Sequence, residues 1–269
     1  PDADAFFKMT DPARQRGGRH VQHIRGLAEA FGLDHGHEQG DVVQVIEHCC
    51  NDGTIIWMNP TLSDCRFNGR CGIVPAIEHP MIEIRKAGER GHFNFGWLDT
   101  WHSFSFGHYR DPKQQGFSDL LVINDDVVQP GMGFGTHPHD NMEIITIPLF
   151  GDLHHRDSTG RDCIIKEHDV QIMSAGSGIQ HSEVNPNKDK RVELFQIWIF
   201  PKERNITPRY DQKSFLPEDR VDQLLTVVSP NEPGTLFINQ DAWLSLGHFK
   251  KPFTTNYPMH QAGQGLFAI

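Results

Sequence analysis

The chain lacks any run of about eighteen consecutive apolar residues, the minimum for a membrane-spanning helix. Its first residues, Pro1 to Ala5, also lack the basic and apolar segments of a secretory signal peptide. We therefore expect a cytoplasmic protein with no membrane partner. The chain begins with Pro1 rather than Met, so a leader removed by processing or truncation stays open.

Basic residues are in the minority. The 25 Lys and Arg residues face 35 Asp and Glu residues, which gives a formal net charge of −10. The sequence shows no Lys or Arg cluster, and neutralisation of phosphates supplies most of a protein's affinity for nucleic acid. We therefore expect no direct binding of nucleic acid.

Cysteine is scarce, and its distribution is uneven. Four of the five residues lie between Cys49 and Cys71, while Cys163 stands alone. The odd number favours a reducing compartment, with a local disulfide as the alternative. A zinc site in the cluster is not favoured, because no Cys-x2-Cys pair exists and Cys49 and Cys50 are adjacent. Histidine, by contrast, occurs 17 times, which makes metal binding the first chemistry to consider.

Residues 1–80 have a mixed pattern. An apolar periodicity over residues 20–31 predicts a helix that ends at Gly32. Short strands are expected around Val43 and Val45 and around Ile55 and Trp57.

From residue 81 onward the pattern is that of an all-β protein. Residues 81–215 contain one alternating run after another, such as Leu194–Ile199, separated by Gly, Pro, Asn and Asp. Residues 216–269 continue with short strands, expected over 224–228 and 242–249. This succession predicts a β-sandwich or β-barrel.

Two short segments carry residues suited to metal binding. His137, His139 and Glu143 share one face if their segment is extended, and His181 and Glu183 share a face in the same way. Two strands that each offer inward ligands two residues apart can close on one ion inside a small barrel. Imidazoles with a carboxylate suit Fe, Mn, Ni, Cu or Zn, and the absence of thiolate argues against a purely structural zinc site.

The same segments carry a family resemblance. The spacing Gly-x5-His-x-His-x3-Glu, followed by Gly-x2-His-x3-Asn, is similar to the two motifs of cupins. The run from Met81 to Phe215 resembles the pirin family, especially its bacterial members with quercetin 2,3-dioxygenase activity. The segments that carry this resemblance are Gly91-His92, Gly96–Phe106, Val122–Asp126, Gly133–His139, Met142-Glu143, Gln171–Gly176, His181–Glu183, Gln196–Ile199 and Pro208–Tyr210.

The resemblance implies an all-β fold and a metal site. We expect a metal-binding cupin (jelly-roll) barrel over residues 81–215, a partial second cupin barrel over 216–269 and a small N-terminal extension over 1–80. His137, His139, His181 and Glu183 correspond to the family's ligands for one divalent metal ion per chain, expected to be Fe(II), with Mn, Ni, Cu and Zn as alternatives. Glu143 is not a usual pirin ligand, and we expect it beside the site, where it would orient a ligand imidazole.

The activity that the resemblance implies is that of a quercetin 2,3-dioxygenase-like oxidoreductase. It would open the ring of a flavonol such as quercetin with dioxygen, and Glu183 would be the catalytic residue that accepts the flavonol's hydroxyl proton. One alternative is an iron-containing, pirin-like binding protein or transcriptional co-regulator without turnover. Another is a structural cupin whose metal only holds two strands together.

The chain departs from the pirin pattern in four places. Phe150-Gly151 and His168-Asp169 replace an acidic-Gly pair and a Gly, and both are expected in turns. Residues 1–80 are an addition that faintly resembles an SH3 domain, whose groove would bind a proline-rich protein partner. Residues 263–269 resemble a strand of the second barrel with an unpaired edge. Residues 1–80 or another subunit would cover that edge, unless the chain is truncated.

Overall fold

The computed structural model describes residues 55–59, 81–250 and 265–268. The helix expected over 20–31, the strands around Val43 and Val45, the cysteine cluster and all of the SH3-like pattern except Trp57 lie outside the described residues. The strand expected around Ile55 and Trp57 is β1 (Ile55–Asn59). Within the described part of the chain, no helix has the length and apolar composition needed to cross a membrane.

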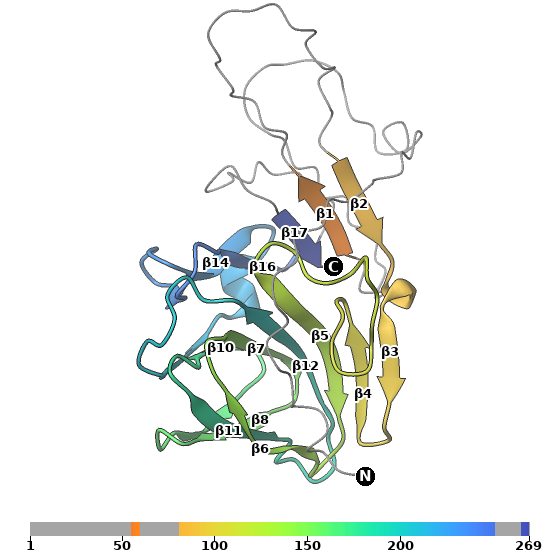
Figure 1. Ribbon diagram of the computed structural model, residues 1–269. Helices are drawn as coiled ribbons and strands as arrows, with labels where there is room; N and C mark the ends of the chain where they lie inside the picture. The colour runs from red at the N-terminus through yellow and green to blue at the C-terminus, as the bar shows by residue number, and fades with distance from the viewer. Residues whose placement is uncertain (1–54, 60–80, 251–264, 269) are drawn as a thin grey trace, which may run out of the picture.

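Two antiparallel sheets form the main body (Figure 1). The larger sheet has seven strands, in the spatial order β13 (Arg209–Ser214), β10 (Asp169–Ser174), β7 (Glu143–Phe150), β12 (Val192–Ile199), β5 (Leu120–Val128), β4 (Leu98–His102) and β3 (Gly91–Asn94). The smaller sheet has four, in the order β6 (Gly133–His139), β11 (Ile179–Val184), β8 (Leu153–Asp157) and β9 (Asp162–Ile165). The predicted all-β cupin fold is confirmed.

Two three-stranded sheets complete the described structure. One contains β15 (Leu236–Phe237), β14 (Leu224–Ser229) and β16 (Leu244–Gly247), and the strands predicted over 224–228 and 242–249 fall here. The other contains β17 (Gly265–Ala268), β1 (Ile55–Asn59) and β2 (Met81–Arg85). Short 3-10 helices, η2 (Ala87–Glu89) and η3 (Pro217–Arg220), join neighbouring strands. Because β1 pairs with β17, a segment of residues 1–80 covers one edge of the C-terminal strand.

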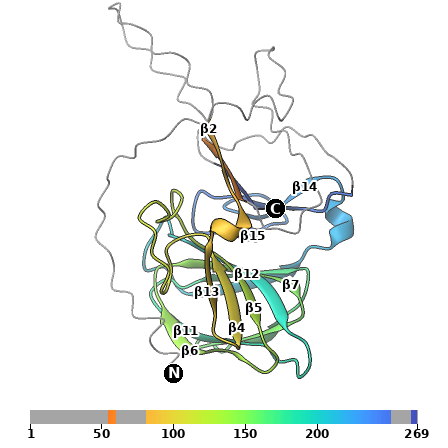
Figure 2. The ribbon, with the colours of Figure 1, turned by 90° about the vertical axis from the view of Figure 1, so that its right-hand side faces the viewer.

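The seven-stranded sheet is covered on both faces, with the four-stranded sheet on one side and β14–β16 on the other (Figures 1 and 2). Ile145 and Ile197 pack in one core cluster with Val227 and Ile238 from the β14 region. Their strand neighbours, including Ile144, face the four-stranded sheet instead, as the two-residue period of a strand requires. The interior between the two main sheets is where the predicted metal ligands converge.

Of the two local departures from the pirin pattern, Gly151 and His168 lie in turns as predicted, whereas Phe150 ends β7 and Asp169 begins β10. Gly151 follows β7 with φ +76°, and His168 precedes β10 with φ +72°. A residue with a Cβ is strained in this left-handed region, so His168 stands where glycine is the easier choice. The boundaries at residues 80 and 215 stay a prediction.

Candidate metal centre

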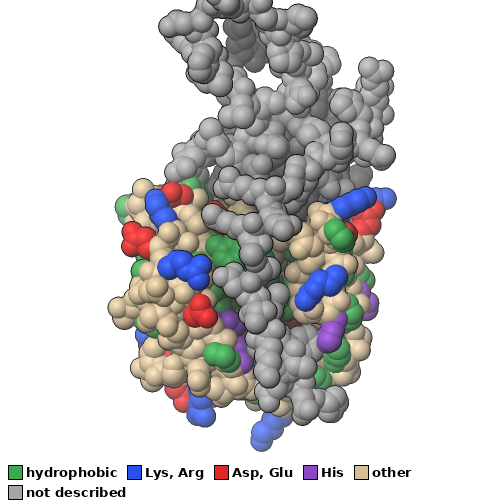
Figure 3. All heavy atoms as spheres, viewed as in Figure 1, with side chains coloured by type: hydrophobic (Ala, Val, Ile, Leu, Met, Phe, Trp, Pro, Cys, Tyr) green, Lys and Arg blue, Asp and Glu red, His purple; other side chains and the backbone are tan. Residues whose placement is uncertain are grey.

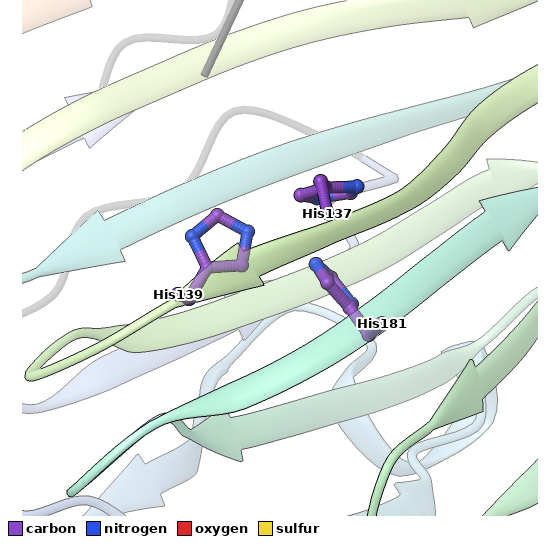
Figure 4. A group of neighbouring side chains, drawn as sticks. All are labelled: His137, His139 and His181. Atoms are coloured by element: carbon purple, nitrogen blue, oxygen red, sulfur yellow. The ribbon is translucent and has the colours of Figure 1, made fainter. Parts of the chain in front are cut away.

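Three histidine rings meet inside the sandwich (Figure 4). His137 and His139 point inward from β6, and His181 points inward from the adjacent strand β11. The ring centroids of His137 and His181 are 4.4 Å apart, and both lie 4.8 Å from the centroid of His139. One potential ligand nitrogen of each ring lies within 4.8 Å of the others, which is close enough for one ion to engage all three.

The strand pairing explains how these rings come together. His181 pairs directly with His137, but the register between β6 and β11 shifts before Glu183, which pairs with Phe134. The strands approach so closely here that a Cβ on Gly133 would lie 2.3 Å from the Glu183 carbonyl oxygen. Glycine at position 133 is therefore required by the close contact, and the shift allows Phe134 and His137 to face the same cavity.

Glu183 lines the same cavity as the three histidines and is 4% exposed. Its Oε2 accepts a hydrogen bond from Gln196 Nε2 at 2.9 Å. Its Oε1 lies 3.2 Å from Thr146 Oγ1, whose single hydrogen is shared with Gln196 Oε1 at 3.0 Å. Each carboxylate oxygen keeps a further lone pair, because an ionised carboxylate has about four acceptor positions. Both partners stand on neighbouring strands of the seven-stranded sheet, β7 and β12, so this sheet orients the carboxylate while leaving it able to bind a cation or a proton.

Burial favours the neutral form, which metal binding requires, in His139 and His181. Burial, reinforced by the neighbouring His181 and His137 rings, lowers the pKa of His139 to about 3 against the opposing charge of Glu183. Burial and the rings of His137 and His155 likewise hold the pKa of His181 well below its ordinary value, although Asp157 acts in the opposite direction. The Nδ1 of His137 lies 2.7 Å from the Gly135 carbonyl oxygen, which assigns the ring hydrogen to Nδ1 and makes Nε2 the nitrogen with the lone pair.

The donor set fits a divalent metal ion. Both ring nitrogens of His181 are buried without a hydrogen-bond partner among the described residues. A buried polar atom left in this state costs about 1–3 kcal/mol, and a metal ion would satisfy one of the two nitrogens. Neutral imidazoles with a carboxylate and no thiolate suit first-row metals such as Fe, Mn, Ni, Cu and Zn.

The cavity also has a second polar wall, which the sequence did not reveal. It is formed by Thr100 and His102 from β4 and by Asn124 and Asp126 from β5. Burial raises the pKa of Asp126 to about 7, although Thr100 Oγ1 donates a hydrogen bond to its carboxyl group at 2.5 Å. Burial lowers the pKa of His102 to about 4. Apolar and aromatic side chains close the rest of the cavity: Leu98, Phe106, Phe134, Ile144 and Trp198.

Glu143 does not take the predicted place. Its carboxylate accepts hydrogen bonds from Ser174 Oγ at 2.8 Å and from the Asn239 amide at 3.2 Å, and it is absent from the lining of the cavity. The prediction assumed an extended chain from His137 to Glu143, but β6 ends at His139 and Asn141 has φ +45°. This turn starts a new strand in the other sheet, where Glu143 faces the β14 region. The expectation that it orients a ligand imidazole is wrong.

Comparisons with known proteins agree with this site. The family model Pirin matches residues 83–199. A protein of Escherichia coli (strain K12) named quercetin 2,3-dioxygenase is 54% identical over 162 residues, which cover 60% of this chain and 69% of the relative. This chain belongs to the pirin family. A putative quercetin 2,3-dioxygenase of Pseudomonas aeruginosa is 40% identical over 181 residues, covering 66% of this pirin and 78% of the relative.

Solved structures give the same relationship. The crystal structure of YhhW from Escherichia coli matches with a TM-score of 0.59 and 53% identity, over 61% of this pirin and 70% of YhhW. The structure of the bacterial pirin YhhW in complex with nickel(II) matches with a TM-score of 0.58 and 52% identity, over the same shares of the two chains. The predicted pirin resemblance is confirmed, and the solved relative binds a metal ion of the class that this donor set suits.

Proposed function

We propose that this pirin is a metal-dependent dioxygenase that opens the ring of a flavonol such as quercetin. His137, His139, His181 and Glu183 would hold one divalent ion, for which Fe(II) is our choice. The observation that carries the proposal is the convergence of the imidazoles of His137, His139 and His181 in a cavity that Glu183 also lines. Relatives that are named quercetin 2,3-dioxygenases support the substrate class. When bound, the ion would supply Lewis acidity toward a chelating hydroxyl and redox chemistry toward dioxygen.

Glu183 would accept the proton of the flavonol hydroxyl. Proton transfer needs a carboxylate with a free lone pair at hydrogen-bond distance from the donor. Thr146 and Gln196 fix the orientation of this carboxylate and still leave acceptor positions on both oxygens. A substrate hydroxyl beside the ion would therefore meet a base that is already oriented.

The opposite wall would recognise the other oxygen atoms of the substrate. The Nδ1 of His102 and the Oδ1 of Asn124 are buried without hydrogen-bond partners among the described residues. Both atoms belong to residues that line the cavity. A polyhydroxylated ring that donates to or accepts from these atoms would remove the cost of leaving them unpaired.

The cavity would have to widen for a whole flavonol. Its free space of about 40 Å³ holds the ion and one or two small ligands, whereas pockets for drug-sized molecules measure about 300–1000 Å³. Phe106 and Trp198 meet edge to face at 5.2 Å in the lining. The chelating edge of the flavonol would enter first, and these aromatic side chains would move to accommodate the remaining rings.

The test begins with metal content. We expect about one iron per chain in the wild-type protein, and little in a variant that combines His137→Ala and His181→Ala, by mass spectrometry. Oxygen uptake with quercetin should then appear in the iron-loaded wild type and fall at least about 100-fold in Glu183→Gln protein that retains iron. Iron-loaded wild type that takes up no oxygen with quercetin would overturn the proposed activity and favour a binding protein without turnover.

A further inference from the structure

Another buried histidine, His155, lies behind the candidate metal centre. His155 is on β8, where it pairs with Glu183 of β11, and its side chain is completely buried. Its ring centroid lies 5.4 Å from that of His181, and Tyr210 covers it at 4.7 Å. Because His155 does not line the cavity, substrate contact does not explain its burial there.

Asp157 fixes the hydrogen on this ring. Its Oδ2 lies 3.0 Å from His155 Nε2, and both side chains are fully buried. Burial raises the pKa of Asp157, but hydrogen bonds from the Thr159 hydroxyl, His155 and the Thr159 and Arg161 amides outweigh burial and lower it. An ionised carboxylate can only accept, so a ring hydrogen of His155 stands on Nε2, and Nδ1 is the nitrogen left to act as an acceptor.

Among the described residues, no other group donates a hydrogen bond to His155 Nδ1. Nδ1 is buried without a hydrogen-bond partner among the described residues, as are both ring nitrogens of His181. A ligand nitrogen of His155, one of His181 and a carboxylate oxygen of Glu183 lie within 4.8 Å of one another. Once one nitrogen of His181 binds metal, the other carries a hydrogen that needs an acceptor.

We propose that His155 is a positioning residue of the metal centre, oriented by Asp157 and accepting a hydrogen bond on Nδ1 from the ring N–H of His181. The inference rests on the metal centre proposed above. A ring nitrogen of His155 lies within 4.8 Å of one of His181, and the hydrogen bond requires about 3 Å between His155 Nδ1 and the His181 N–H once the other nitrogen of His181 is bound. Such a partner holds the ligand ring in one orientation and makes it a stronger donor; its loss typically costs about 10–100-fold in metal affinity.

The chain provides a matched control on the same strand. His154 Nε2 pairs with Asp162 Oδ1 at 2.6 Å, so it is also a histidine–aspartate pair. This pair faces the surface, with side chains 26% and 53% exposed. Two substitutions with the same chemistry can therefore be made at the inner and the outer pair.

The experiment measures the affinity of the metal-free proteins for Ni²⁺ by competition with a chromophoric chelator. His155→Phe keeps a ring against Tyr210 but removes both nitrogens, and Asp157→Asn removes the charge that fixes the tautomer. We expect both to lower the affinity by about 10–100-fold and to shift the visible absorption bands of the Co²⁺-loaded protein. His154→Phe and Asp162→Asn should change the affinity less than about twofold.

Each outcome decides the matter. Wild-type affinity and spectra in Asp157→Asn, and in His155→Phe where it folds, would overturn the positioning role while the metal centre stands. A loss beyond about 1000-fold in His155→Phe would also overturn it, because that loss is expected of a ligand. If the wild type binds no Ni²⁺, or binds it equally well after His137→Ala, the metal centre itself fails and the inference fails with it.

Discussion

Replacing Asp126 with Asn should remove a large part of the pH dependence of this protein's stability. Asp126 is 3% exposed, and its pKa rises from 3.8 to about 7 through burial, with smaller contributions from the charges of Asp125 and Glu183. The native state therefore keeps a proton that the unfolded state releases near pH 4. Between these two pKa values the native state binds more protons, so the free energy of unfolding falls as the pH rises.

The size of the effect follows from the two pKa values. A difference of about 3 pKa units corresponds to about 4 kcal/mol over the whole window, of which roughly 3 kcal/mol falls between pH 5 and pH 8. Asn cannot ionise, and its Oδ1 still accepts the hydrogen bond that Thr100 donates to position 126. The variant should therefore resemble the wild type in acid and be the more stable protein at pH 8.

The assay is urea unfolding of metal-free wild type and Asp126→Asn at pH 5, 6, 7 and 8. Chelation is necessary because a cation beside Glu183 would favour the ionised form of Asp126 and flatten the wild-type curve. Equal pH dependence in the two proteins would refute the reasoning, since it would mean that Asp126 is ionised in the native state throughout.

Two further outcomes are expected. Gly133→Ala places a Cβ 2.3 Å from the Glu183 carbonyl oxygen, so it should lower the free energy of unfolding by about 2 kcal/mol or more and weaken Ni²⁺ binding. In the control Gly135→Ala the new Cβ meets nothing within 4 Å, and both quantities should change little. Equal effects of the two substitutions in calorimetry and in Ni²⁺ titration would contradict the close approach of β6 and β11. His168→Gly should relieve about 1 kcal/mol of backbone strain at φ +72° and raise Tm by about 2–4 °C. A lower Tm would show that the His168 side chain stabilises the fold by more than the strain costs.

Periodicity predicted much of this structure because most of the informative segments are strands. The face shared by His137 and His139, and the face shared by His181 and Glu183, follow from the two-residue period alone. The same rule failed for Glu143, because a turn at Asn141 separates two strands of different sheets. A two-residue period holds within one strand and carries nothing across a turn.

Other features were beyond the reach of the sequence. Adjacent His154 and His155 must face opposite ways on a strand, but only the packing of β8 against β11 decides which of them is buried. Asn124 and Asp126 look like ordinary polar positions of an alternating strand, yet their alternation turns the polar face inward. On the face shown in Figure 3, the described acidic and basic side chains are interspersed rather than gathered, in keeping with the absence of a Lys or Arg cluster in the sequence.

The two walls of the cavity belong to different strands, and this separation has a consequence for divergence within the fold. The three converging imidazoles stand on β6 and β11, whereas the opposite polar wall stands on β4 and β5. These two pairs of described strands lie in different sheets, so no backbone hydrogen bonds between paired strands connect them. Substitutions on β4 and β5 would therefore reshape one wall of the cavity while the backbone that carries the residues of the proposed metal centre stays unchanged. Under the proposed function, such substitutions would exchange the organic substrate while the inorganic chemistry is kept.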